Sequence, residues 1–503
     1  MFSCFGQKRA EAKQEQDLEN GGKRIIAWEE IKKHDKPNDC WVVYEGTVYD
    51  VTEFVPNHPG GAAIWWQGGG RDITILYNIS HPPRITLESH LAKYGKLVGE
   101  ADGPEVKGAP EYDFQSPFWV ELKIKCWEKL YDLVKNVKGY DGVKYYKVTY
   151  GEKDLFLYCL FLCLLNIATF MTVYLLPVFF QHASLHFWRD MFFYISLGSA
   201  LFIRGPLICV CSSMMHEARH RDQFSLFYII SDMSGMSSLR YQLEHSWHHN
   251  WPNCPAGEIE QSFAYAPGMR HFTWQPRRCF HRFQWLYWPL SFCLVLLQVA
   301  ITDVTGFFLK GRMGALTASS WTCRELMIFI VGKLMLVISF TWPFISAAAG
   351  LHPLTWDNYA GYLIVFFANW FSCSFWLTLI NVPAHLTMDE LEDKDVQDID
   401  FAKTQIAHSR TFSAGSRCMT WLTFGTNTQT EHHLFPTVPF RYLPDITPII
   451  QEVSEKHNVN FRKPYDGFLT VFKLYLDRIV YLSKPESEEK APAAPPVVLE
   501  VEA

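Results

Sequence analysis

The sequence carries little charge and has no excess of basic residues. Only 19% of its 503 residues are Asp, Glu, Lys or Arg, and the formal net charge is −6. Because nucleic-acid binding relies on clustered Lys and Arg, we expect no nucleic-acid partner. The 13 cysteines follow no spacing typical of metal sites or disulfide frameworks. We therefore expect reduced thiols that serve in packing.

Neither end of the sequence has a long apolar segment. Residues 1–23 are polar and mixed in charge, without the apolar core of a cleaved signal. They predict a disordered N-terminus that stays in the cytosol. The last 20 residues are rich in Pro, Glu and Ala, a composition typical of a disordered tail.

Apolar residues gather instead in the middle of the chain, and aromatic residues make up 16% of the whole. This balance is typical of a protein that lies partly in a membrane. Four stretches are long enough to cross about 30 Å of hydrocarbon. They are residues 155–180, 192–215, 325–350 and 359–382. A fifth stretch, residues 285–304, is shorter and contains Pro289, Gln298 and Asp303.

Histidines occur in four short motifs outside these stretches or at their ends. The motifs contain His216 and His220 in MHEARH, His245, His248 and His249 in EHSWHH, Asn381 and His385 in NVPAH, and Gln429, His432 and His433 in QTEHH. Residues three or four apart share a helix face, so each motif can present ligands side by side. One structural zinc needs only four ligands, so these motifs predict two metal ions. Imidazole suits iron, zinc and copper, and the ligand type alone leaves the metal open.

If these motifs build one site, they must lie on one side of the membrane. An even number of crossings must then separate EHSWHH from QTEHH, although three candidate spans lie between them. We expect residues 285–304, which polar residues interrupt, to lie in the interface instead of spanning. The same reasoning places His182 and His186, which follow the first span and precede the second, on the opposite side.

Residues 24–100 predict a small soluble domain with short strands broken by Gly and Pro. This part resembles cytochrome b5, through Trp41, the VYDV run 48–51, the HPGG run 58–61, the GRDIT run 70–74 and His81. The resemblance implies a haem b held axially by His58 and His81. Pro82 and Pro83 directly after His81 depart from the pattern, and His90 is the weaker rival for the second ligand. Two axial histidines fill the coordination of the iron, so this haem would carry electrons.

Residues 101–153 are expected to form a linker. Within it Phe118, Leu122, Trp127, Leu130 and Val134 recur at helical spacing among Lys and Glu. This pattern predicts an amphipathic helix that lies on the bilayer. A helix that faces a protein core is the alternative.

An electron-carrying haem fused to a histidine-rich membrane site suggests activation of dioxygen against an unactivated C–H bond of a lipid. Zinc cannot change its redox state, so the metal should be iron. Over residues 24–465 the chain resembles a front-end fatty acyl desaturase with a fused cytochrome b5 domain. The resemblance rests on HPGG, H-x3-H at 216–220, H-x2-HH at 245–249 and Q-x2-HH at 429–433.

The resemblance implies two non-haem iron ions and a cis double bond inserted between an existing double bond and the carboxyl end. It implies an α+β haem domain (24–100) fused to an all-α multi-pass membrane domain (154–465) with about four transmembrane helices, interfacial helices and a cytosolic cap. Residues 466–503 would be a C-terminal segment and tail. Asn381 and His385 resemble an extra metal-side pair of acyl-CoA desaturases, although Pro383 lies between them.

The implied partners are a fatty acyl-CoA or acyl-lipid substrate, O2, membrane lipids and NADH–cytochrome b5 reductase. We expect the reductase to dock on an acidic rim of the haem domain, with Glu53, Asp72 and Glu88 as candidates. The implied location is the endoplasmic reticulum membrane, with the haem domain, the metal site and both termini in the cytosol.

Several alternatives remain open at the level of sequence. Gln429 is either a ligand or a hydrogen-bond partner of a ligand, and Glu217 and Arg219 either orient histidines or form a surface ion pair. HEARH matches the zinc protease motif H-E-x-x-H, which would leave the other histidine motifs and the haem without a use. A lipid hydroxylase, a sphingoid long-chain-base desaturase and a membrane-tethered cytochrome b5 that donates electrons to partners are the other rival functions.

Overall fold

The computed structural model describes residues 24–58, 63–83, 93–135, 153–175, 186–219, 232, 236–253, 268–273, 275–310, 312–313, 316–317, 323–350, 356–387 and 399–485. The chain divides into two compact units, Met1–Ala109 and Pro110–Ala503. The segments expected to be disordered, residues 1–23 and the end of the tail, lie outside the described residues, as do His90, His182 and His220.

The first unit is α+β, as the sequence predicts. Its sheet has the strand order β1-β6-β4-β3-β2, and β5 pairs with β3. The strands are β1 (Ile25–Ile26), β2 (Asp35–Lys36), β3 (Asp39–Tyr44), β4 (Thr47–Asp50), β5 (Arg71–Asp72) and β6 (Lys96–Ala101). Glu45 and Gly46, which join β3 to β4, both have positive φ, 47° and 77°. This is the geometry of a two-residue hairpin turn, and the glycine adopts it without strain.

Short helices complete this unit around an apolar core that includes Ile31, Val43 and Val48. They are α2 (Trp28–Ile31), η1 (Val55–Asn57), α3 (Ala63–Gly68) and α4 (Thr74–Ser80). His81 follows α4 in an extended conformation, with φ −110° and ψ 140°. A residue before proline avoids helical geometry, so Pro82 ends the helix and leaves His81 at its tip.

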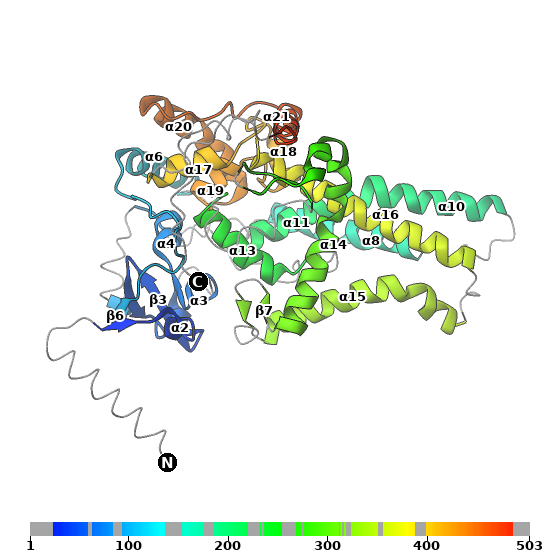
Figure 1. Ribbon diagram of the computed structural model, residues 1–503, viewed down its shortest axis with the longest axis horizontal. Coiled ribbons are helices and arrows are strands. Elements are labelled where there is room, and N and C mark those ends of the chain that lie inside the picture. The colour runs from blue at the N-terminus through cyan, green and yellow to red at the C-terminus, as the bar shows by residue number, and fades with distance from the viewer. Residues whose placement is uncertain are drawn as a thin grey trace, which may run out of the picture. The chain divides into compact units, whose positions relative to one another are not determined.

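The second unit consists mainly of helices, several of them long and apolar (Figure 1). The long elements are α8 (Lys153–Tyr174), α10 (His186–Ser199), which a π-helical turn (Ala200–Arg204) joins to α11 (Gly205–Arg219), α14 (Gln284–Lys310), α15 (Cys323–Ala348) and α16 (Trp356–Asn381). Helix α16 packs against α8, α10, α11, α14 and α15. Apolar side chains on the outside of α8, such as Phe161 and Ile167, are more than half exposed. Such surfaces are stable in contact with lipid.

Among the described residues, three helical stretches are long and apolar enough to cross a membrane: Asp190–Glu217, Cys279–Gly306 and Tyr359–Ala384. Two of the four expected spans are in this group, and the other two contain the shorter apolar helices Leu157–Val173 and Leu326–Ser339. The stretch expected to lie in the interface, residues 285–304, is part of the continuous helix α14 and is long enough to span. Pro289 lies inside α14, so it does not end the helix. In Figure 1, α14 runs across the direction of α15 and α16.

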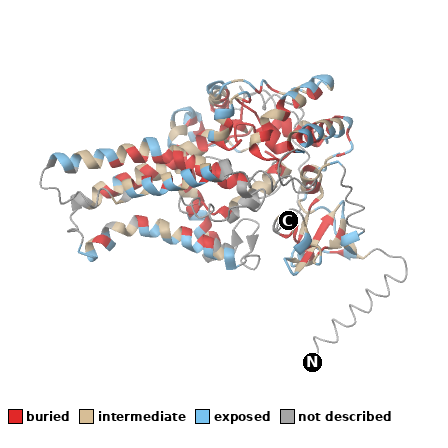
Figure 2. Cartoon of the chain, turned by 180° about the vertical axis from the view of Figure 1, so that it is seen from behind, coloured by how far each residue is buried: buried red, intermediate tan, exposed pale blue. Residues whose placement is uncertain are grey.

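Shorter helices form a compact cap at one end of the long helices, where burial is greatest (Figure 2). They are α6 (Pro117–Val134), α13 (Ser238–Asn250), α17 (Phe401–His408), α18 (Arg417–Thr423), α19 (Gln429–Leu434), α20 (Leu443–Lys456) and α21 (Phe468–Tyr481). Short 3-10 turns lie at Cys279–Phe283 (η3), Val382–Ala384 (η5) and Phe440–Tyr442 (η8), and β7 (Arg312–Met313) pairs with β8 (Leu316–Thr317).

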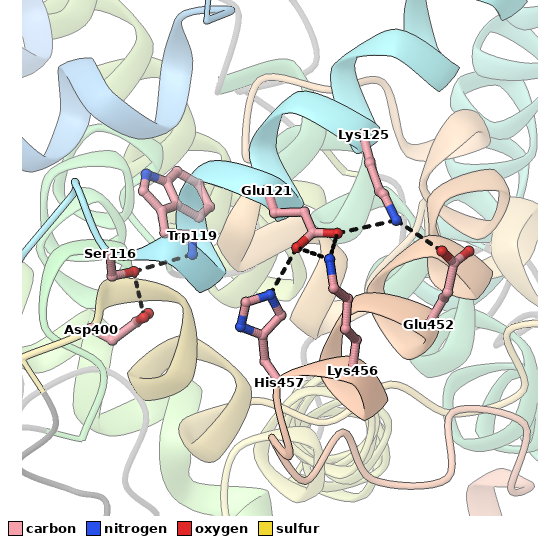
Figure 3. Close-up of polar contacts among 8 residues, drawn as sticks. All are labelled: Ser116, Trp119, Glu121, Lys125, Asp400, Glu452, Lys456 and His457. Atoms are coloured by element: carbon pink, nitrogen blue, oxygen red, sulfur yellow. Dashed lines mark hydrogen bonds and ion pairs between the residues drawn. The ribbon is translucent and has the colours of Figure 1, made fainter.

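Helix α6 is the amphipathic helix that the sequence predicts, but its apolar face contacts protein. Phe118, Leu122 and Leu130 are at most 3% exposed, and the helix packs against α17 and α20. Its polar face contributes Glu121 and Lys125 to ion pairs with α20 (Figure 3). The core-facing alternative is therefore correct. Helix α6 belongs to the second unit and is no part of a free linker.

Candidate metal centre

Seven histidines of the second unit form two groups in which ligand nitrogens lie within 4.8 Å of one another. His216, His245, His249 and His432 make the first group, and His248, His385 and His433 make the second. They come from α11, α13, α19 and the residue after η5. Three of the predicted motifs and His385 of the fourth therefore meet at one place. His220 lies outside the described residues.

The two His-His dipeptides are divided between the groups. His248 and His249 are adjacent on α13, yet His248 lies in the second group and His249 in the first. His432 and His433 are divided in the same way on α19. Successive residues on a helix point about 100° apart, so a dipeptide can serve two centres side by side. His245, four residues before His249, shares its face and its group.

The nitrogen positions in the first group fit a metal ion better than a hydrogen-bond network. His245 Nε2 lies 2.7 Å from His216 Nε2 and 2.9 Å from His249 Nε2. A ring nitrogen offers either one proton or one lone pair in its plane, so it cannot serve both neighbours well. Convergent Nε2 atoms at these separations suit a shared cation with metal–nitrogen bonds of about 2 Å.

Burial keeps His248 and His385 of the second group neutral. Desolvation lowers the pKa of His385 to about 4 and that of His248 well below its ordinary value. The neutral imidazole is the form that binds metals, because a protonated ring has no lone pair to give.

Gln429 and Asn381, the two amides among the predicted ligands, differ in their surroundings. Gln429 lies beside His385, and its buried Oε1 has no hydrogen-bond partner of standard geometry among the described residues. Asn381 is the last residue of α16, and its Nδ2 donates to the Leu377 carbonyl at 2.8 Å. Both line the cavity next to the histidines. The orphaned oxygen of Gln429 is available to a cation.

Two buried carboxylates support the histidine motifs. Glu217 is 1% exposed and accepts a hydrogen bond from the Phe440 amide at 2.9 Å, so it is no surface ion pair. Glu431, inside QTEHH, accepts hydrogen bonds from Thr411 and from Thr447, the latter at 2.5 Å. Burial raises the pKa of Glu431. Sequence reasoning missed Glu431, although a carboxylate inside a ligand motif is itself a signal.

The cavity beside the histidines has polar and apolar walls. The polar lining includes His216, His245, His248 and His385, and the apolar lining includes Val295, Leu296 and Val299 of α14 and Leu377 of α16. Such walls exclude water and accept a hydrocarbon chain. The arrangement brings an apolar ligand to the two histidine groups.

In the first unit, His58 and His81 face each other with ring centroids 6.1 Å apart. If both rings bound one iron from opposite sides, their centroid distance would be the sum of two metal–nitrogen bonds of about 2 Å and two distances from nitrogen to ring centre, which is similar to the separation found. His81 Nδ1 donates to the Tyr77 carbonyl at 3.0 Å, which leaves Nε2 as the coordinating atom. The pair therefore fits a haem iron. Of the rim candidates, Glu53 is exposed and pairs with Lys96, Asp72 accepts from the Thr74 amide, and Glu88 lies outside the described residues.

Two family models match the chain. The model "Fatty acid desaturase" covers residues 192–465, and "Cytochrome b5-like Heme/Steroid binding domain" covers residues 27–101. The first match includes all the histidines of the two groups, and the second includes His58 and His81.

Known proteins resemble the chain over most of its length. Delta(5) fatty acid desaturase A of Dictyostelium discoideum is 26% identical, covering 86% of this chain and 89% of that protein. The acyl-lipid (8-3)-desaturase of Physcomitrium patens is 27% identical, covering 91% of this chain and 90% of that protein. L-lactate dehydrogenase (cytochrome) of Saccharomyces cerevisiae is 43% identical over 75 residues, 15% of this chain and 12% of that protein. No solved structure matches. The chain belongs to the fatty acid desaturase family, oxidoreductases that act on acyl chains, and carries a cytochrome b5-like domain at its N-terminal side.

Proposed function

We propose that the chain is a front-end desaturase that inserts a cis double bond into an unsaturated acyl chain, on the carboxyl side of an existing double bond. The observation that carries this proposal is the meeting of two histidine groups with an apolar cavity. The names of the relatives in Dictyostelium and Physcomitrium favour a carboxyl-proximal position and an acyl-lipid substrate over acyl-CoA. The haem domain would occupy residues 24–100 and the membrane domain residues 154–465. Helix α6 would also belong to the membrane domain.

Each histidine group would hold one non-haem iron. His216, His245, His249 and His432 would bind the first iron, and His248, His385 and His433 the second. We assign His220 to the centre from its motif and Gln429 to the second iron from its place beside His385. Asn381, whose Nδ2 donates to the Leu377 carbonyl at 2.8 Å, would offer its Oδ1 to the centre from the cavity wall. Bound iron would supply the redox chemistry that zinc lacks.

The protein's own side chains would bind and orient the substrate. The apolar residues of α14 and α16 would hold the acyl chain straight past the histidine wall and keep water out. The distance from the carboxyl end to the site of reaction would then depend on how far the chain enters the cavity. This dependence would set the position of the new double bond.

Electrons would enter through the haem domain. His58 and His81 would hold haem b in a form that carries electrons and does not bind oxygen. NADH–cytochrome b5 reductase is the proposed donor, with Glu53 and Asp72 on its docking surface.

We place the protein in the endoplasmic reticulum membrane with the metal centre, the haem domain and both termini in the cytosol. Arg277, Arg278 and Arg282 lie just before α14, and residues 268–302 contain no acidic residue. A basic cluster next to an apolar helix favours the cytosolic side. Phe280, Phe283 and Trp285 are about half exposed beside it, as is typical of aromatic residues in the interface.

Fatty-acid profiling of yeast that expresses the chain and receives polyunsaturated acids tests the function. A new double bond on the carboxyl side of an existing one is expected, and it should disappear in the variant His248→Ala/His249→Ala. A hydroxylated lipid or a desaturated long-chain base would contradict the front-end acyl assignment. Absence of any product, with normal expression and haem absorbance, would contradict the enzyme assignment as well.

A further inference from the structure

Helix α17, which contributes no histidine to either group, makes direct contacts with both. Its Gln405 is fully buried. The side-chain Nε2 of Gln405 donates to the His249 carbonyl at 2.9 Å. Its Oε1 lies 2.8 Å from His433 Nδ1. One glutamine therefore links the backbone of His249, a member of the first group, to the ring of His433 in the second.

These two contacts determine which nitrogen of His433 carries the proton. A backbone carbonyl can only accept, so the amide NH2 of Gln405 must face His249. Its Oε1 must then face His433, and Nδ1 of His433 must donate to it. The proton is therefore on Nδ1, which leaves the lone pair on Nε2. Nε2 is then the nitrogen that His433 offers to a cation shared with His248 and His385.

The other end of α17 acts on His385 in the same way. His385 Nδ1 lies 3.2 Å from the carbonyl oxygen of His408, the last residue of α17. Nδ1 must again be the donor, because the carbonyl only accepts. Helix α17 thus sets the tautomer of two of the three histidines described in the second group.

The helix is itself held firmly at both ends. Asp400 caps its N-terminus and accepts from the Ser116 hydroxyl at 2.5 Å (Figure 3). Arg462 donates to the Ala407 carbonyl at 2.7 Å near its C-terminus. These contacts hold Gln405 and the His408 carbonyl in place.

We infer that Gln405 is a positioning residue for the second metal ion: it holds His433 in the tautomer that offers Nε2 and ties it to the helix that carries His248 and His249. This inference rests on the proposed function, because it assumes that the second group binds iron. Partners of this kind commonly change metal affinity by about 10–100-fold when they are removed.

The test uses the purified full chain with Gln405→Met, which keeps the length of the side chain without its hydrogen bonds, and Gln405→Glu, which keeps an acceptor for His433. Gln451→Met on α20 is the matched control, since the Gln451 side chain donates to Glu455 on the exposed face of its own helix. Ferrous iron is titrated into protein that retains its haem but has been stripped of non-haem iron, and the bound non-haem iron is counted against haem. A parallel Co²⁺ titration records the absorption spectrum of each site.

We expect Gln405→Met to bind the first iron normally and the second about 10–100-fold more weakly. Gln405→Glu should recover much of the second site, and Gln451→Met should resemble the unmodified chain. Equal affinity for two irons in Gln405→Met would overturn the inference. Loss of both irons together in Gln405→Met and Gln405→Glu would also overturn it, since that result indicates a packing role. Failure of the unmodified chain to bind non-haem iron would instead contradict the proposed function.

Discussion

At the scale of residues, adjacent histidines serve different centres. The pairs His248/His249 and His432/His433 each give one ring to each group, because neighbouring helical residues point in different directions. The number of histidines in the sequence predicted two metals. The angle of about 100° between successive residues of a helix predicts how the histidines are divided between them. The supporting residue Gln405 could not be identified in this way, because it lies outside the histidine motifs and its burial cannot be read from the sequence.

The haem histidines allow a prediction at the same scale. Replacement of His81 by Ala should abolish haem absorbance and product formation while leaving non-haem iron in place, because the two units have separate cores. Haem absorbance and metal analysis on one sample measure both effects. His34→Ala is the control, since this histidine of the same unit stacks on Trp41. Joint loss of haem and non-haem iron in His81→Ala would contradict the separation.

At the scale of elements, α6 supports the third histidine motif. Trp119 is 1% exposed. Its ring stacks on that of Phe435, with centroids 5.8 Å apart, and meets the ring of Phe401 in α17 edge-on, with centroids 5.1 Å apart. Phe435 directly follows α19. The periodicity of residues 117–134 predicted this helix, but periodicity does not tell whether an apolar face meets lipid or protein. The answer depended on α17, α19 and α20, which are distant in sequence.

Truncation of Trp119 tests this support. Trp119→Ala should destabilise the second unit by about 3–5 kcal/mol, the usual cost of removing a buried Trp side chain. Thermal unfolding in detergent should show a lower midpoint and earlier loss of non-haem iron. The control is Tyr131→Ala on the same helix. Tyr131 is 43% exposed, so its truncation should change the unfolding midpoint little. Equal effects of the two substitutions would contradict the packing role of α6.

The polar face of α6 gives a prediction about pH. Glu121 accepts hydrogen bonds from His457 and Lys456 and pairs with Lys125 (Figure 3). These contacts lower its pKa from 4.5 to about 2. Because the folded pKa is the lower one, the stabilisation is present above pH 4.5 and is lost as the pH falls from 4.5 toward 2.

Glu121→Gln should therefore lower the unfolding midpoint slightly at pH 7, and the difference from the unmodified chain should shrink toward about pH 3. Added salt should also shrink it, since the partners are partly exposed. Thermal melts across this pH range are the measurement. A difference that grows as the pH falls from 4.5 to about 3 would contradict a lowered pKa of Glu121 in the folded chain.

At the scale of the whole molecule, composition and motifs indicated the order of units well: a small α+β unit, then long apolar helices and a histidine-rich cap. The status of residues 285–304 could not be read from the sequence, because polar residues within a helix do not shorten it. Helix α14 is long enough to span, yet it runs across α15 and α16 (Figure 1). Whether α14 spans the membrane or lies in the interface depends on the direction of its axis relative to the other long helices, and the sequence does not contain that direction.

Electron delivery from a separate protein gives a prediction for the whole molecule. If the reductase docks through acidic residues such as Glu53, the rate of haem reduction by NADH should fall as salt rises, because screening weakens contacts between exposed charges. Stopped-flow absorbance of the haem measures this rate. A rate that does not respond to salt would exclude a charged docking surface.

Metal analysis of the purified chain tests the proposed pair of irons most directly. Elemental mass spectrometry and haem quantification on the same sample should give two irons beyond the haem iron. His249→Ala, in the first group, and His385→Ala, in the second, should each reduce that number. Zinc in place of iron, or no metal beyond the haem iron, would contradict the two-iron centre and with it the proposed chemistry.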